Sequence, residues 1–425
     1  MIESQTKKTM RLIIMTQCAG MISLLLFNNG FILTYLSKLG IPSSRILFFL
    51  SLPYLISFLL TTPFAFISDR FGKKKVGTMG LIGTVIGLFL LTVAGNLPNQ
   101  LTNWAVGAGI TIFGIGFAIF MSGWFALLEP IVPPNIRGRF FGKLRLSWHL
   151  VGIVVTLVIT RVLQTYSTPG VYQIILCVII LLSFVWIFSY AQIPEIDKSR
   201  PQNISLRKSF SHVVSIPGYM PFCSYVFLLT LFTGACHLIF GLLEKDVLNF
   251  SEYQIVMMGN LLFAGNLIGF YFGGRMIDRY GTKFVFLFCH LSFAVILFLF
   301  VGRSIFPLPV IVTVGFLSVC FGSARAATGI AVTTEMMALI PKENKSLSTS
   351  LNFTLIAAGT TLSGMISGKA VELNILNKSW KLFGLTMSEY DTLLLGCGIM
   401  VILLIVTLGL IPSVIKKAQW IPQRT

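Results

Sequence analysis

A short basic turn decides the fold of this chain because it occurs twice. The first copy reads Asp69-Arg70-Phe71-Gly72-Lys73-Lys74, and the second, 209 residues later, reads Asp278-Arg279-Tyr280-Gly281-Thr282-Lys283. Each copy lies between two long apolar stretches, and self-similarity at a fixed separation indicates an internal duplication. Glycine gives a tight turn its backbone freedom, so we expect both turns to require Gly72 and Gly281. The duplicated unit is a set of apolar segments joined by basic turns.

The composition places these apolar segments in lipid. Hydrophobic residues make up 55% of the 425 residues, charged residues make up 11%, and the mean hydropathy is +0.86. A soluble chain carries about a quarter charged residues. A helix of about 20 apolar residues crosses the hydrocarbon of a bilayer, so we predict an all-α polytopic membrane protein. Its twelve predicted spans run approximately over residues 12–36, 46–68, 76–95, 103–129, 144–165, 171–192, 219–243, 254–274, 284–302, 308–338, 348–371 and 392–414.

The positive charges predict the orientation of the chain in the membrane. The net charge is +18, and 23 of the 32 lysines and arginines lie in the two terminal tails and in alternate loops. This asymmetry predicts that both termini are cytoplasmic, in a multi-pass protein of the cell's inner membrane. The charge is a topology signal, so we expect no nucleic-acid partner. The first span lacks a small-residue cleavage site and a second span follows at once, so we expect it to be retained.

A polar stretch between the sixth and seventh spans divides the chain. We predict a six-helix bundle over 1–192, a cytoplasmic linker over 193–216 and a second six-helix bundle over 217–425. The seven cysteines lie in predicted spans with no CxxC pair. Cys236 and His237 are adjacent, and neighbours on a helix point about 100° apart. We therefore predict no metal site and no cofactor.

The repeated turn also carries a family resemblance. The pattern Gly-x-x-x-Asp-Arg-x-Gly-(Arg/Lys)-(Arg/Lys), between spans two and three and again between spans eight and nine, resembles the signature loop of the major facilitator superfamily. The second copy keeps the leading glycine as Gly274, whereas the first has Ala65. Both residues are small, so we expect the ends of these spans to pack closely. The twelve-span layout extends the resemblance to the whole chain, and it implies two pseudo-symmetric bundles that move a solute by alternating access.

The resemblance further implies a cytoplasmic network of ion pairs that forms and breaks during transport. The string from Glu129 to Arg137-Gly138, between spans four and five, is similar to one that many members carry, and Glu335 begins its degenerate second copy. Asp69 and Asp278 in the two turns are expected to face the positive N-terminal end of a neighbouring helix, which contributes about 0.3–1 kcal/mol. The alternative, solvated interfacial charges worth less than about 1 kcal/mol a pair, stays open. The predicted signature and gate residues are Asp69, Arg70, Gly72, Lys73, Lys74, Gly274, Asp278, Arg279, Gly281, Lys283, Glu129, Arg137, Gly138 and Glu335.

Arg325 is the most informative polar residue inside a predicted span. It lies near the middle of span ten, and no acidic residue lies at the same depth in another predicted span. A central arginine costs about 2.5–3.5 kcal/mol on insertion scales, so it is expected to have a partner. The partner is either an anionic solute or, in a structural role, a backbone carbonyl or water.

Five further residues are candidates for contact with a solute. Asn28 and Asn29 lie on span one, Trp124 on span four, His237 on span seven and Asn352 on span eleven. The family resemblance places these spans around the central cavity. Each side chain can instead form a hydrogen bond between helices, and both interpretations stay open.

These observations predict a secondary transporter for a small organic solute. Arg325 favours a solute that carries a negative charge. We also predict that the protein is a monomer in the lipid bilayer. A proton is a possible co-transported ion, but no deep carboxylate marks a carrier. A proton-coupled multidrug efflux antiporter is the alternative, although the Arg-x-x-Gln-Gly and Gly-Pro-x-x-x-Gly-Gly strings of such exporters are absent. A membrane scaffold or a membrane-embedded enzyme is a further alternative. No cluster of acids, histidines or cysteines resembles an active site, so we expect no enzymatic activity.

Overall fold

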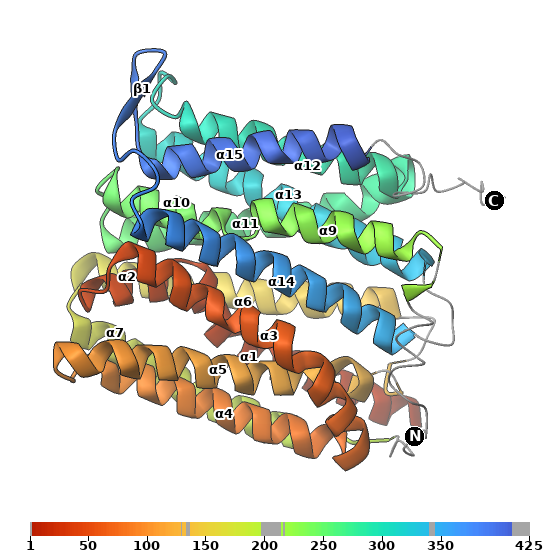
Figure 1. Cartoon of the computed structure of the whole chain (residues 1–425). Coiled ribbons are helices and arrows are strands. Elements are labelled where there is room, and N and C mark those ends of the chain that lie inside the picture. Colours follow the sequence, from red (N-terminus) through yellow and green to blue (C-terminus); the bar gives the residue numbers. More distant parts are fainter. Residues whose placement is uncertain are drawn as a thin grey trace. The chain divides into compact units, whose positions relative to one another are not determined.

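The computed structural model describes residues 2–128, 130–132, 137–196, 214–215, 217–339 and 345–409. Helices form most of these residues (Figure 1). The chain divides into two compact units, which are Met1–Asn203 with Phe250–Met257 and Ile204–Asn249 with Met258–Thr425. Most of the predicted linker, 193–216, lies outside the described residues.

Unit 1 is a bundle of long helices with one interruption. Its elements are α1 (Ile2–Asn28), α2 (Phe31–Lys38), α3 (Ser43–Phe71), α4 (Lys73–Ala94), α5 (Asn99–Leu128), α6 (Arg137–Thr165) and α7 (Pro169–Ala191). Helices α4 and α5 approach closely because glycines face each other. A Cβ added to Gly116 would lie 2.4 Å from the Gly80 carbonyl oxygen, so no larger residue fits there without a shift of the backbone.

Unit 2 is built in the same way and adds a small hairpin. Its elements are α9 (Tyr219–Thr233), α10 (Cys236–Asp246), α11 (Glu252–Tyr280), α12 (Thr282–Val301), α13 (Val310–Leu339), α14 (Lys345–Glu372), β1 (Trp380–Leu382), β2 (Leu385–Met387), α15 (Glu389–Leu404) and a π-helical turn (Ile405–Gly409). The first residues of α11 cluster with unit 1, where Glu252 pairs with Lys38 at 2.7 Å.

The two units repeat the same helix pairs. In unit 1, α4 packs on α5 and α7, and α1 packs on α6 and α7. In unit 2, α12 packs on α13 and α15, and α9 packs on α14 and α15. These pairs correspond when the chain is shifted by six spans, so the duplication seen in the two basic turns extends to the helix packing.

The first span of each half is broken. Helix α1 ends at Asn28 and α2 begins at Phe31, with Gly30 between them at φ 84°. Helix α9 ends at Thr233 and α10 begins at Cys236. Interrupted membrane helices leave backbone groups without intrahelical partners and are typical of transporter binding sites.

Eleven helical segments among the described residues are long and apolar enough to cross a membrane. The fold class predicted from the sequence, an all-α polytopic membrane protein, is confirmed. Helix α14, which contains the predicted span 348–371, is not among the eleven, and it carries many serines and threonines. The seventh span is longer than predicted, because it runs from Tyr219 to Asp246 and so includes Glu244.

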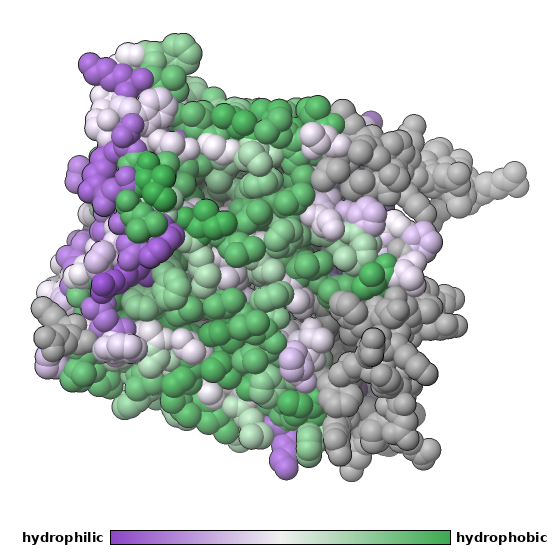
Figure 2. Space-filling view, viewed as in Figure 1, coloured by the Kyte–Doolittle hydropathy of each residue, from purple (hydrophilic) through white to green (hydrophobic). Residues whose placement is uncertain are grey.

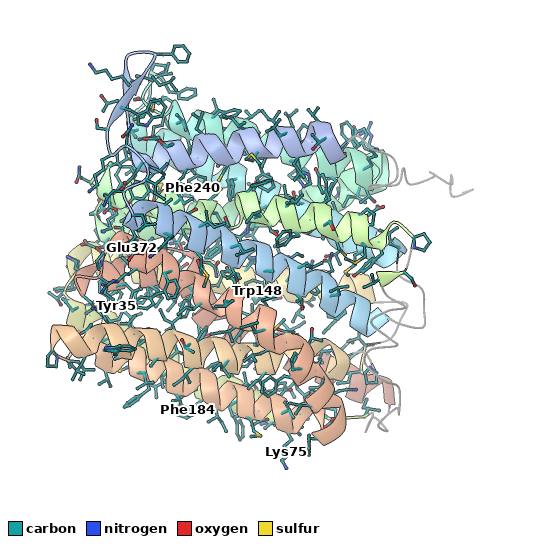
Figure 3. The ribbon with its side chains drawn as sticks, in the orientation of Figure 1. Tyr35, Lys75, Trp148, Phe184, Phe240 and Glu372 are labelled. Atoms are coloured by element: carbon teal, nitrogen blue, oxygen red, sulfur yellow. The ribbon has the colours of Figure 1, made fainter. Side chains whose placement is uncertain are left out.

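The outer faces of the helices have the character expected for contact with lipid. Apolar side chains cover the visible lengths of the helices, and hydrophilic ones gather toward the end that carries β1 (Figure 2). Phe184 on α7 is 55% exposed and points away from its helix bundle (Figure 3). Lys75, near the start of α4, also points outward, at an end of the bundle (Figure 3).

A buried ion pair fastens unit 2 at its hairpin end, which we define as the β1–β2 hairpin, the turn after α12 and the start of α15. Arg303 follows α12 and pairs with Asp391 in the first turn of α15, and the two residues are 6% and 0% exposed. Asp391 also takes part in a capping box with Ser388. Each buried charge therefore has partners, which a buried ion pair needs to persist.

Candidate functional site

The two signature turns have the same unusual backbone. A single residue connects the helices in each case, Gly72 between α3 and α4 and Gly281 between α11 and α12. Gly72 has φ 101° and ψ 125°, and Gly281 has φ 82° and ψ 160°. Other residues rarely adopt positive φ with extended ψ. The expectation that both turns require glycine is thus supported by their geometry.

A carboxylate occupies the N-terminus of α4, and it comes from an unexpected residue. The Lys73 backbone N–H donates to Glu195 Oε1 at 2.8 Å, and Tyr190 at the end of α7 donates to the Lys73 carbonyl at 3.3 Å. A negative charge is favourable at this position because helix N-termini are partly positive. The sequence analysis assigned this kind of contact to Asp69 and missed Glu195. The available signal was an acid in Ile193-Pro194-Glu195, directly after a span.

Several predicted gate residues cannot be placed. The side chains of Asp69, Arg70, Asp278 and Arg137, the surroundings of Gly138 and the whole of Glu129 lie outside the part of the chain that the structure describes. Their assignment to a gate stays a prediction.

The remaining gate residues lie at the ends of their helices. Lys73 is buried and Lys74 and Lys283 are half-buried. The Arg279 guanidinium lies 5.2 Å from the centre of the Tyr280 ring, which is a cation–π distance. Glu335 on α13 is 5% exposed.

Gly274 does not have the packing role that we expected. A Cβ added to Gly274 would meet no described atom within 4 Å. The preceding Gly273 is the packed residue, since its added Cβ would lie 2.9 Å from the Ala327 Cα on α13. The helical period explains the correction, because adjacent residues face directions about 100° apart and only one of them can face α13.

Arg325 lies half-way along α13, about 22 Å from either end at 1.5 Å per residue. Its side chain is half-buried. Among the described residues, no hydrogen bond or ion pair holds its guanidinium group. Arg303, in contrast, is buried and has Asp391 as its partner. Arg325 is therefore a cation in a membrane helix whose protein counter-ion is not found within the described ranges.

His237 lies within electrostatic range of Arg325. It follows Cys236 at the start of α10, directly after the break in the seventh span, and the charge of Arg325 acts on both residues. His237 is 8% exposed. The Gly234 carbonyl lies beside the ring, but neither ring nitrogen has a hydrogen-bond partner of good geometry among the described residues. Two polar groups from α10 and α13 thus share one region of unit 2 with their hydrogen-bonding capacity unused.

The asparagines at the break in the first span differ in their bonding. Asn28 is fully engaged, because its Nδ2 donates to the Leu24 carbonyl at 3.0 Å and its Oδ1 accepts from the Tyr54 hydroxyl at 3.0 Å. Asn29 is 0% exposed, and its Oδ1 accepts from the Phe31 backbone N–H. Its Nδ2 has no partner among the described residues. Among the described residues, Asn29 is therefore the one of the two with an unused hydrogen-bond donor.

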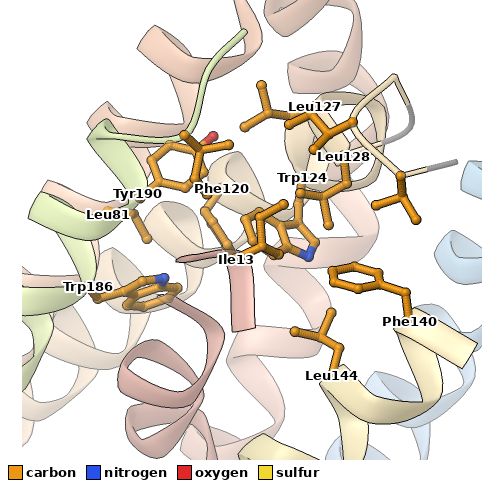
Figure 4. Close-up of a cluster of buried hydrophobic side chains, with 13 residues drawn as sticks. Ile13, Leu81, Phe120, Trp124, Leu127, Leu128, Phe140, Leu144, Trp186 and Tyr190 are labelled. Atoms are coloured by element: carbon orange, nitrogen blue, oxygen red, sulfur yellow. The ribbon is translucent and has the colours of Figure 1, made fainter. Parts of the chain in front are cut away.

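Trp124 and Asn352 are packed inside their units. Trp124 is 1% exposed in a cluster with Phe120, Trp186 and Tyr190 (Figure 4). Asn352 on α14 is 1% exposed, and its Nδ2 lies 3.5 Å from the Cys223 sulfur on α9. These contacts favour the helix-packing role that the sequence analysis left open for both residues.

Comparison with solved structures shows what this fold resembles. A mutant form of the nucleoside transporter NupG has a TM-score of 0.72 at 15% identity, over 95% of this chain and 98% of that chain. A POT family transporter in complex with 5-aminolevulinic acid has a TM-score of 0.71 at 11% identity, over 96% of both chains. A bacterial homologue of the iron transporter ferroportin has a TM-score of 0.69 at 11% identity, over 95% and 99%. At these identities the similarity shows the fold alone.

Comparison of sequences identifies the family. The uncharacterized MFS-type transporter YdeE of Escherichia coli (strain K12) is 28% identical over 112 residues, and the match spans about a quarter of each protein, 26% of this chain and 27% of the relative. The sequence profile of the Major Facilitator Superfamily matches residues 14–364. With a repeated signature turn, two units with the same helix pairs and this match over most of its length, the chain belongs to the Major Facilitator Superfamily, whose members are transporters and not enzymes.

Proposed function

We propose that this protein transports a small organic anion across the inner membrane by alternating access, with Arg325 as the anion-binding residue. The observation that carries the proposal is Arg325 in the middle of α13, which has no hydrogen-bond or ion-pair partner among the described residues and lies within electrostatic range of the buried His237 ring. A guanidinium group can bind a carboxylate or phosphate through two parallel hydrogen bonds. His237, within electrostatic range of Arg325, adds a ring that can form hydrogen bonds.

The structural relatives leave the chemical class of the solute open. Their titles name a nucleoside transporter and POT transporters bound to 5-aminolevulinic acid or to a thioalcohol-conjugated peptide. One fold therefore serves solutes of different charge. Arg325 is the feature of this chain that favours an anion, and Asn29 at the break of the first span is the proposed contribution of unit 1.

The proposal includes the cytoplasmic gate. Asp69 and Asp278 hold the cytoplasmic side closed when the cavity opens outward, and Asp69 has the larger effect because its turn keeps every basic position of the signature. Both termini are cytoplasmic in this proposal, as the distribution of lysine and arginine predicts.

Thermal-shift measurements on the purified protein test the role of Arg325, because a solute that binds only the folded state raises its melting temperature. The probes are matched pairs of small carboxylates and their neutral amides, together with uridine and uridine monophosphate. We expect an anionic member to raise the melting temperature and its neutral partner to have little effect. Charge-assisted hydrogen bonds contribute about 1.5–3 kcal/mol, so Arg325→Gln should weaken binding of that anion by about tenfold to a hundredfold or more.

Arg325→Lys should retain weaker binding, because lysine keeps the charge but loses the two-pronged geometry. Arg161→Gln is the matched control. Arg161 lies near the end of α6 and bonds to Gln164 at an exposed site, so its loss should leave the binding of the anion unchanged. If Arg325→Gln binds the anion as tightly as the parent protein, Arg325 has a structural role and the preference for anions is wrong.

A further inference from the structure

Glu244 is a carboxyl group buried inside a membrane-spanning segment. It lies on α10, two residues before the end of the span Tyr219–Asp246, and is 2% exposed. Every residue from Cys236 to Glu244 is buried. Within the described ranges, no hydrogen bond or ion pair holds the Glu244 carboxyl group. The prediction that no deep carboxylate marks a proton carrier did not consider it, because the predicted span ended at residue 243.

Glu244 takes no part in the ion pairs that the described residues of α10 and α15 form. On α10 itself, Asp246 pairs with Lys245 at 2.8 Å and accepts a hydrogen bond from Tyr390. On α15, which packs against α10, Asp391 pairs with Arg303. Glu389 also begins α15, and the charges that act on it are those of Lys378 and Asp246. Burial therefore dominates the surroundings of Glu244, and none of these charged groups forms an ion pair with it among the described residues.

Glu244 lies on the same face of α10 as His237. The two residues are seven positions apart, which is almost two full turns and about 10 Å along the helix axis. Both side chains are more than nine-tenths buried. Among the described residues, the Glu244 carboxyl group has no hydrogen bond or ion pair, and the His237 ring has no hydrogen-bond partner of good geometry. His237 in turn lies within electrostatic range of Arg325. One face of α10 therefore carries two buried ionisable groups, and the one nearer the break in the span lies within electrostatic range of the proposed anion site.

A buried ionisable group of this kind can bind and release a proton. An ionised carboxylate without a partner is costly in apolar surroundings and stable in water. A carboxyl group that alternates between these surroundings therefore binds a proton when it is buried and releases it when water reaches it. Ionisable groups inside membrane spans that pair with nothing structural are typical of proton pathways.

We propose that Glu244 binds the proton that is coupled to transport, so that the solute cycle is driven by a proton gradient. The step is a proton transfer from water to the Glu244 carboxylate at the end of the span, with return of that proton to water after the conformational change. His237 lies about two turns earlier on the same face of α10, within electrostatic range of Arg325. This inference rests on the proposed transport function and adds its coupling ion.

The pH dependence of the conformational equilibrium tests the proposal without a solute. Spin labels are attached to cysteines at Tyr166 in unit 1 and Phe383 in unit 2, which are 63% and 96% exposed, in a protein that lacks the seven native cysteines. Pulsed electron resonance then measures the distance between the labels in vesicles at acidic and alkaline pH. We expect the parent to shift between two distance populations as the pH changes. Glu244→Gln should stay in the acidic population at every pH, because glutamine resembles the protonated acid.

Glu372→Gln is the matched control, because Glu372 is exposed at the end of α14 and pairs with Lys369 (Figure 3). It should keep the pH response of the parent. Glu244→Asp retains a carboxyl group at another position, so it should keep the response with a displaced midpoint, and it serves as the test if Glu244→Gln does not fold. A pH response that is absent in the parent, unchanged in Glu244→Gln or Glu244→Asp, or lost equally in Glu372→Gln overturns the proposal.

The outcome is separable from that of the proposed function. Anion binding that depends on Arg325 with no effect of Glu244 on the pH response leaves an anion transporter without this proton site. A pH response that depends on Glu244 without anion binding at Arg325 leaves a proton-coupled transporter for a different class of solute.

Discussion

At the scale of single residues, the signature turn separates a conformational requirement from a packing one. Gly281 has a backbone conformation, φ 82° and ψ 160°, that is nearly restricted to glycine. Gly274 belongs to the same motif but lies within α11, and an added Cβ would meet open space. The first copy of the motif has Ala65 at the position that corresponds to Gly274. The turn conformation thus requires glycine at Gly281, whereas neither conformation nor packing requires it at Gly274.

This difference predicts opposite effects for the same substitution. Gly281→Ala should destabilise the protein by about 1–3 kcal/mol, the cost of a side chain in a sparsely populated backbone region. Gly274→Ala should be neutral or stabilising, because alanine is favoured over glycine by about 1 kcal/mol within a helix. Thermal unfolding of the two purified variants in the same detergent measures the contrast. Equal decreases in melting temperature would mean that the turn does not depend on the positive φ of Gly281.

At the scale of elements, two carboxylates are associated with the turn between α3 and α4, and they have different assignments. Glu195 follows α7 and accepts a hydrogen bond from the first backbone N–H of α4. It therefore fastens two helices of the same unit to each other. Asp69 is the residue that the family resemblance assigns to the gate, where contacts must form and break.

We predict that Asp69→Asn and Glu195→Gln affect different properties. Asp69→Asn should shift the resting population toward the inward-facing state, measured as the distance between labels on the cytoplasmic ends of the two units, and should slow transport. Glu195→Gln should mainly lower the melting temperature, because it removes a charge–helix interaction worth about 0.3–1 kcal/mol. The assignments are wrong if Glu195→Gln shifts the label distance and Asp69→Asn does not.

At the scale of the whole molecule, the asymmetry of charge sets the orientation of twelve predicted spans. Loops rich in lysine and arginine stay in the cytoplasm because their transfer across the membrane is unfavourable. We therefore predict that the signature turns, the linker over 193–216 and both termini are cytoplasmic. On this prediction, the hairpin end of unit 2 and the end of the Glu244 span face outward.

Single cysteines in a protein without the native seven measure this orientation. A cysteine at Ser205 should resist a membrane-impermeant thiol reagent in intact cells, and a cysteine at Asn99 should react with it. Reaction of both positions after the cells are permeabilised is the control for accessibility. The reverse pattern in intact cells would place the termini outside and would also reverse the side from which Glu244 meets its proton.

The sequence by itself determined the fold class, the duplication and the conformation of the signature turns. These features are set by local chemistry, since twenty apolar residues suffice for a span and Gly72 and Gly281 suffice for a turn with positive φ. It also selected Arg325, because a charge in an apolar run is visible without any structure.

Only the tertiary structure showed which polar groups already have hydrogen-bond or ion-pair partners within the protein. Asn28 bonds to Tyr54 across two helices, and Arg303 pairs with Asp391 from a distant part of the chain, whereas Arg325 and His237 have no such partner among the described residues. The sequence cannot distinguish these cases, because hydrogen-bond partners are brought together by helix packing between residues far apart in the chain. The burial of Glu244 could not be predicted from the sequence for the same reason, because it depends on the helices that pack around α10 and not on the residues next to Glu244 in the chain.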